Sequence, residues 1–144
     1  MDRNEQILSL IGLCLRGRNL EVGEEPVEAV SRARDARLIL LASDAADNTA
    51  RRAQRFAETG QCIWLRVPFT RRELGQAVGR GSAAIAAVTD VRLALSLLTA
   101  LGEPEKNREA LEVLSAKAEK VKKHQAEAKA HVKNVRKGKK KSRF

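Results

Sequence analysis

Short aliphatic runs alternate with amphipathic stretches along the first hundred residues. The clearest run, Leu-Ile-Leu-Leu over residues 38–41, contains no polar position. Four consecutive aliphatic residues fit a strand that helices cover on both faces, as in α/β proteins. Asp44, Asp47 and Asn48 follow this run, and their side-chain oxygens can cap the first amides of a helix. We therefore expect a buried strand that leads directly into a helix.

The rest of this region repeats the alternation of helix and strand. Apolar residues at helical spacing, capping residues such as Asp2, Thr70 and Asp90, and terminating glycines predict helices, whereas further aliphatic runs predict strands. Short connections between these elements predict one α/β domain, in which a mixed, four-stranded sheet lies between two helix layers. We expect helices near residues 3–16, 26–33, 47–59, 71–78 and 91–101, and strands near residues 20–22, 38–41, 61–67 and 83–89.

A change in composition near residue 102 divides the chain. Residues 1–101 contain 14 Arg, no Lys and 12 acidic residues, whereas residues 102–144 contain 11 Lys, 3 Arg and 6 acidic residues. Gly102 and Pro104 suit the end of one helix and the start of another. We therefore expect a folded domain over residues 1–101 and a separate basic segment over residues 102–144. In that segment, an apolar stripe at heptad spacing from Leu111 predicts a helix, and the lysine-rich end is expected to be disordered without a partner.

The net charge of +10 favours a polyanionic partner. Lysines are point charges suited to phosphate contacts without base recognition. An anionic membrane is the weaker alternative, because the predicted basic helix lacks the aromatic residues that an interfacial helix buries. The stripe could instead dock on the domain or pair with another chain, but Ala and Val form a weak seam, so a stable oligomer is the weaker expectation. The expected phosphate contacts of the segment are Lys122, Lys123, Lys133, Arg136, Lys137, Lys139, Lys140, Lys141 and Arg143.

The sequence offers no catalytic or metal-binding pattern. Its two histidines, His124 and His131, lie among lysines that disfavour a cation, and no nucleophile with a base can be placed at the strand ends. We therefore expect no enzymatic activity and no cofactor or metal. Cys14 and Cys62 lie in apolar runs and are expected in the core rather than in a disulfide. Without a secretory signal or an apolar run near the ~18 residues of a membrane span, we expect a cytoplasmic protein.

Arginines next to the expected strand ends form the candidate site of the domain. Ligands of open α/β sheets bind at the carboxyl ends of the strands, and guanidinium groups suit phosphate oxygens. A charged solvent face is the alternative explanation. Phe69 is a candidate for stacking on a base, with burial against the sheet as an equal alternative, whereas Trp64 lies inside a strand and is expected to be core or half-buried. The candidate arginines are Arg51, Arg52, Arg71, Arg72 and Arg80.

Several short motifs occur in the order and spacing of a known family. Over about residues 7–100, the chain resembles the ribosomal protein L-seven-Ae/L-thirty-e superfamily, and most closely its bacterial ribosomal-protein-like branch. The resemblance implies a three-layer α-β-α sandwich that binds structured RNA, in many members a kink-turn, and that has no enzymatic activity. The matching motifs are Gly12-Leu13, Gly23, Ala36-Arg37-Leu38, Asp44-Ala45, Asn48-Thr49-Ala50-Arg51-Arg52, Leu74-Gly75, Val78-Gly79 and Ala87-Val88-Thr89-Asp90.

The resemblance also implies an RNA-binding surface. In the family, this surface combines the glycine turn before the second helix, the loop before the Leu-Gly helix and nearby basic residues. Kink-turn binders carry Asn-Glu-x-x-Lys from two residues after the glycine, and those three positions here are Glu25, Pro26 and Ala29. The replacement removes recognition groups and adds a negative charge. Besides the arginines, the residues implied are Gly23, Glu24, Glu25, Asn48, Thr49, Val67, Pro68 and Phe69.

Two functions follow as hypotheses. The first is a ribosomal-protein-like binder of structured RNA, with ribosomal RNA and the ribosome as candidate partners. It would hold RNA with the loop edge of the sheet and with the basic segment. The alternative is a protein-interaction module on the same fold, whose striped helix engages a partner, and the missing Asn-Glu-x-x-Lys motif favours it. High salt should release RNA but should not dissociate an apolar helix pair.

Overall fold

Five helices and four strands alternate along the described part of the chain, which comprises residues 2–102, 112 and 114–116 of the computed structural model. The structure confirms the type and order of every element expected over residues 3–101. The expected helix, disordered end and phosphate contacts of the basic segment fall mostly on residues 103–111, 113 and 117–144, outside the described residues. The helices are α1 (Arg3–Arg16), α2 (Glu24–Arg32), α3 (Asp47–Gly60), α4 (Arg71–Ala77) and α5 (Val91–Leu101), and the strands are β1 (Leu20–Val22), β2 (Leu38–Leu41), β3 (Ile63–Arg66) and β4 (Ile85–Val88).

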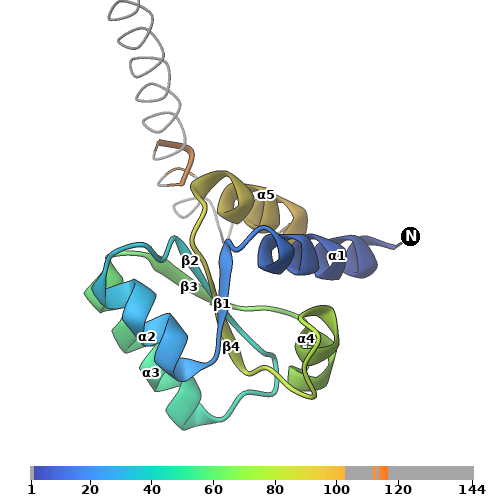
Figure 1. Ribbon diagram of the computed structural model, residues 1–144, viewed down its shortest axis with the longest axis horizontal. Helices are drawn as coiled ribbons and strands as arrows, with labels where there is room; N and C mark the ends of the chain where they lie inside the picture. Colours follow the sequence, from blue (N-terminus) through green and yellow to red (C-terminus); the bar gives the residue numbers. More distant parts are fainter. Residues whose placement is uncertain (1, 103–111, 113, 117–144) are drawn as a thin grey trace, which may run out of the picture.

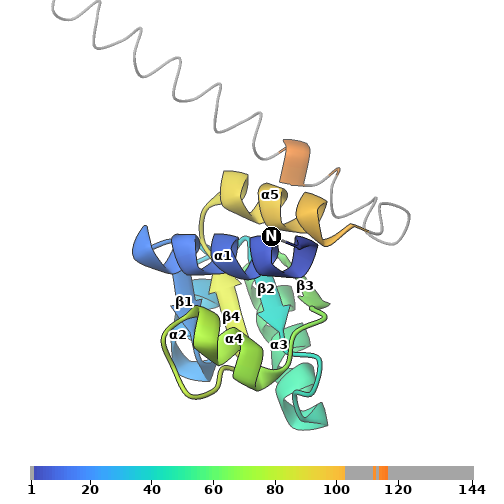
Figure 2. The same cartoon turned by 90° about the vertical axis from the view of Figure 1, so that its right-hand side faces the viewer.

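The four strands form one mixed sheet in the order β1-β4-β2-β3. β4 runs antiparallel to β1 and β2, whereas β2 and β3 are parallel. Consequently, β1, β2 and β3 all end at the edge of the sheet where β4 begins. α2 and α3 lie on one side of the sheet, and α1, α4 and α5 lie on the other (Figures 1 and 2). This arrangement confirms the expected three-layer sandwich.

The hydrophobic core is centred on β2 and β4, the two inner strands. Every residue of both strands is buried, as the uninterrupted aliphatic runs predict. β3 is an edge strand and is less covered, so Trp64 is half-buried, as expected. Cys14 on α1 is completely buried, and burial, assisted by the negative charge of Asp90, raises the pKa of its thiol to about 11. No helix among the described residues is long and apolar enough to cross a membrane.

One core residue comes from beyond α5. Leu114 has no exposed surface and belongs to the same hydrophobic cluster as the buried residues of α1 and α5. The short segment around it lies beside α5 in both views (Figures 1 and 2). Leu114 is the second position of the expected apolar stripe, so the stripe packs against the domain at this point. A truncated protein that preserves the core should therefore end after residue 116.

The helix caps agree with the sequence patterns at α1, α4 and α5 but differ at α3. The expectation that Asp44, Asp47 and Asn48 cap α3 is wrong, because its N-cap is Ala46 and no side chain caps it. Asp47 is already helical, and Asn48 accepts a hydrogen bond from Arg51 at 2.9 Å. Asp44 is used elsewhere, in a contact with the start of α4.

Candidate nucleic-acid interface

Four connections meet at one end of the sheet, which we call the loop edge. They are residues 23, 42–46, 67–70 and 78–84, which follow β1, β2 and β3 and precede β4. Backbone hydrogen bonds join them: the amide of Gly23 donates to the carbonyl of Ile85 at 3.0 Å, and the amide of Ser43 donates to that of Phe69 at 2.7 Å. Gly23 has φ +105°, a conformation that favours glycine and turns the chain from β1 into α2. The connections are therefore held in one arrangement.

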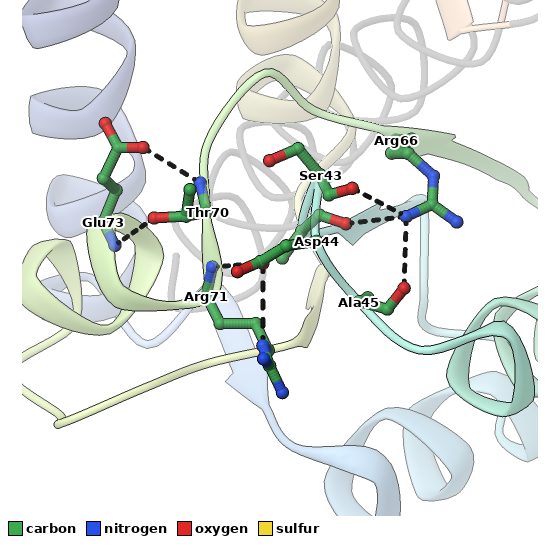
Figure 3. A network of polar contacts seen from close by, with 8 residues as sticks. Ser43, Asp44, Ala45, Arg66, Thr70, Arg71 and Glu73 are labelled. Atoms are coloured by element: carbon green, nitrogen blue, oxygen red, sulfur yellow. Dashed lines mark hydrogen bonds and ion pairs between the residues drawn. The ribbon is translucent and has the colours of Figure 1, made fainter.

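A guanidinium group from β3 organises the connection that follows β2 (Figure 3). One terminal nitrogen of Arg66 faces the carbonyl oxygens of Ala42, Ser43 and Ala45 at 3.2, 3.0 and 3.4 Å. The carbonyl of Ala42 also accepts a hydrogen bond from the amide of Ala45 at 3.2 Å, and the guanidinium adds a donor that all three carbonyls of this turn share. Arg66 was not among the residues predicted from the sequence. A basic residue at the end of an edge strand was the only available signal.

Asp44 joins the same turn to the start of α4 (Figure 3). Its Oδ1 accepts a hydrogen bond from the amide of Arg71 at 2.8 Å and lies 3.6 Å from that residue's Nε. The hydrogen bond from this amide, with help from the guanidinium charge, lowers the pKa of Asp44 below its ordinary value. Thr70 and Glu73 form the expected capping box, with hydrogen bonds of 3.0 and 3.1 Å. The start of α4, where Arg71 and Arg72 lie, is therefore anchored.

A glycine brings α4 close to the connection before β4. A Cβ on Gly75 would lie 2.6 Å from Cα and 2.7 Å from the amide nitrogen of Ser82. The carbonyl of Gly75 also accepts a 2.7 Å hydrogen bond from the amide of Arg80. Only a residue without a side chain permits this approach. The Leu74-Gly75 motif thus determines where Arg80 stands relative to α4.

Charged side chains also join the starts of α2 and α3. Arg52 forms an ion pair of 2.6 Å with Glu24, and both side chains are partly exposed. Arg51, Arg52 and Arg55, with Asn48, line a shallow depression of about 340 Å³ on α3. Arg55 was not among the arginines predicted from the sequence, although its position four residues after Arg51 places it on the same helix face.

The structure separates the implied RNA-binding residues into exposed and buried groups. The expectation that Phe69 can stack on a base is wrong, because its ring has no exposed surface; the alternative of burial is confirmed. Val67 is also buried and Thr70 is half-buried, so Pro68 is the one exposed side chain of this loop. Contact of the remaining residues with RNA stays a prediction. The exposed residues are Glu25, Asn48, Arg51, Arg52, Pro68, Arg71, Arg72 and Arg80, and the half-buried ones are Gly23, Glu24 and Thr49.

The sequence of this chain is similar to that of a known RNA-binding protein. Over 96 residues, the chain is 34% identical to the RNA-binding protein YlxQ of Bacillus subtilis, and the alignment covers 64% of this chain and 91% of that protein. The chain belongs to the L-seven-Ae/L-thirty-e family. No model of a protein family matches the chain.

Two solved structures have a fold similar to that of this chain. A protein with unknown function from Bacillus halodurans superimposes with a TM-score of 0.61 at 29% identity, covering 66% of this chain and 95% of that one. The 15.5kD RNA binding protein of Giardia lamblia superimposes with a TM-score of 0.56 at 15% identity, covering 74% and 90%. At that low identity, the second similarity supports the fold alone.

Proposed function

We propose that this protein is a cytoplasmic, non-enzymatic RNA-binding protein that holds structured RNA at its loop edge, with ribosomal RNA as the candidate ligand. The observation that carries the proposal is the 34% identity to the RNA-binding protein YlxQ over 91% of that protein's length. The loop edge supports it, because this edge presents exposed arginines from α3, from α4 and from the connection before β4.

The surface suits the backbone and shape of RNA rather than the edges of its bases. The deep major groove of an RNA helix is closed to side chains, so folded RNA is recognised through phosphates, shape and exposed bases. Guanidinium groups donate planar pairs of hydrogen bonds to phosphate oxygens. Since Asp44 and Arg66 hold the supporting turns, little ordering of the backbone opposes binding. Buried Phe69 offers no stacking platform, so we assign recognition to charge and shape.

The start of α2 is the least favourable part of this edge for RNA. Glu24 and Glu25 place two carboxylates there, and Arg52 offsets only the first of them. At the start of α4, by contrast, the cations outnumber the anions. Arg71, Arg72 and Arg80 lie near two carboxylates, those of Asp44 and Glu73. RNA should therefore approach from the α4 side. Because the family's kink-turn residues are replaced at α2, the preferred ligand should be a folded RNA without a kink-turn.

Binding measurements across a salt series test the proposal. Full-length protein and a 1–116 truncation, which retains Leu114, would be titrated with a kink-turn RNA, a straight duplex and a structured ribosomal RNA fragment. We expect both proteins to prefer the ribosomal fragment, and the full chain to bind more tightly. Each phosphate contact steepens the slope of log K against log salt by roughly 0.7 to 0.9. Binding of neither protein to any RNA at low salt would refute the proposal and favour the protein-interaction alternative.

Single substitutions locate the surface. The side chains of Arg72 and Arg80 are exposed and make no hydrogen bond or ion pair within the described residues, so neither is needed for folding. Arg72→Gln and Arg80→Gln should each weaken RNA binding and reduce the salt slope. Arg32→Gln, which removes the same charge from the last turn of α2 and breaks only an exposed ion pair with Glu28, is the matched control and should have a smaller effect. Equal losses in all three variants would indicate binding by net charge alone.

A further inference from the structure

The end of the sheet opposite the loop edge also gathers arginines, and we call it the basic edge. It consists of residues 16–19, 33–37 and 89–92, which connect α1 to β1, α2 to β2, and β4 to α5. The amide of Thr89 donates to the carbonyl of Asn19 at 2.9 Å, and the amide of Arg37 donates to that of Val88 at 2.8 Å. These bonds hold the three connections side by side. None of these residues belongs to the RNA-binding surface described above.

The charge of the basic edge is less balanced than that of the loop edge. It carries Arg16, Arg18, Arg34, Arg37 and Arg92, against two carboxylates, Asp35 and Asp90. Asp90 is already engaged, because it caps α5 by accepting a 2.9 Å hydrogen bond from the amide of Leu93. Across the described residues, Arg16, Arg18, Arg34 and Arg37 form no ion pair. At the loop edge, by contrast, two arginines are paired with carboxylates.

Two of these arginines occupy a backbone conformation that disfavours a side chain. Arg18 has φ 61° and Arg34 has φ 60°, directly after the last turns of α1 and α2, and both are exposed. Glycine or asparagine is the usual residue at such a helix end. A cation near a helix carboxyl end interacts well with the helix dipole, but positions in the last turn provide this without the left-handed conformation. Strained residues of this kind occur most often at functional sites.

The same edge contains an unsatisfied donor. Nε of Arg37 is buried and has no hydrogen-bond partner, although buried donors in folded proteins are nearly always paired. Arg37 is the last residue before β2, whereas Arg18 precedes β1, which lies two positions away from β2 in the sheet. Neighbouring strands lie about 4.8 Å apart, so the backbones of these two arginines are separated by about 10 Å across the sheet. The edge therefore presents a row of cations rather than a single site.

We propose that the basic edge is a second RNA contact, which binds the phosphates of another RNA segment while the loop edge holds the first. The inference rests on the proposed function but concerns a different surface. β2 spans four residues, about 13 Å, so the two edges are separated by the length of the strands and face opposite ways. The protein would thus join two segments of a folded RNA. The last described residues, 114–116, lie beside α5, which begins at the basic edge (Figures 1 and 2).

Glycine substitutions at the left-handed positions separate a binding role from a structural one. In the full-length double variant Arg18→Gly/Arg34→Gly, glycine relieves the backbone strain, so the melting temperature should stay the same or rise. Loss of two phosphate contacts should lower the slope of log K against log salt by about 1.4 to 1.8. If the variant and the wild type bind equally at 1 M salt, the variant should then bind roughly 25- to 60-fold more weakly at 0.1 M salt. Gln61→Gly, at the third left-handed position (φ 53°), is the control that removes no charge.

A bridging assay gives the second readout. Biotinylated ribosomal RNA fragment on beads would be incubated with protein and then with a fluorescent copy of the same fragment. Wild-type protein and Gln61→Gly should retain the fluorescent RNA, whereas the double variant should bind the beads without retaining it. Retention and salt slope equal to wild type in the double variant would overturn the inference, while the proposed function would stand. Failure of the wild-type protein to bind the first RNA would refute both.

Discussion

Replacing Gly75 with alanine should destabilise the domain by forcing α4 away from the connection before β4. The new Cβ would lie 2.6 Å from Cα of Ser82, whereas carbon atoms pack at about 3.5–4.0 Å, so that backbone must move by about 1 Å. Such overpacking costs about 1–3 kcal/mol. The displacement also strains two backbone hydrogen bonds of 2.7 and 2.9 Å, Arg80 to Gly75 and Ala83 to Arg71, each contributing about 1 kcal/mol.

The helix itself gains from alanine, which offsets part of this cost. Alanine stabilises a helix interior by about 1 kcal/mol relative to glycine, so the net loss should be about 2 kcal/mol. For a domain of this size, that corresponds to a melting temperature about 8–16 °C lower. Thermal unfolding followed by circular dichroism measures the shift.

Gly81→Ala provides a control in the same connection. A Cβ on Gly81 would meet no atom within 4 Å, so this variant should melt within a few degrees of wild type. If Gly75→Ala melts at the same temperature as Gly81→Ala, the close packing of Gly75 against Ser82 carries no energetic weight, and the reasoning fails.

Three further predictions concern single charged or ionisable groups. Asp44→Asn should lower the melting temperature at pH 7; because the folded-state pKa lies below 3.8, the stabilisation is present above that pH and the difference should close as pH falls below it. The unfolding free energy in urea should fall by about 1.4 kcal/mol per pH unit between pH 9 and 11, because the Cys14 thiol ionises first in the unfolded chain. A Cys14→Ala variant with the same slope would contradict this. Glu24→Gln should change stability by less than about 1 kcal/mol, because the Glu24–Arg52 pair is exposed, yet it should strengthen RNA binding; weaker binding would show that the ion pair positions Arg52.

Local patterns predicted the elements well because the interactions that define them are local. The Thr70 capping box and the Asp90 cap involve partners three residues away, and the buried strand over residues 38–41 is a run of four aliphatic side chains. Asp44 shows the limit of such patterns. Its partner, the amide of Arg71, is 27 positions away, and that pairing depends on which connections meet at the loop edge.

The composition of the candidate site was harder to predict than the fold. Phe69 stands in a polar loop, but the hydrogen bond from Ser43 to its carbonyl draws the backbone inward and leaves the ring in the core. Arg66 looked like the last residue of a strand, and its role in the neighbouring turn needs the parallel pairing of β3 with β2. The basic edge combines three separate connections, so it becomes visible only once the order of the strands is known.

The position of β4 bears on how the chain acquires its structure during synthesis. β4 is the last strand to be made, yet it lies between β1 and β2, which do not contact each other in the sheet. A nascent chain that has not yet reached residue 85 can pair only β2 with β3, and β1 has no neighbour. The domain should therefore gain its stability in one late, cooperative step. That step completes the loop edge and the basic edge at the same moment.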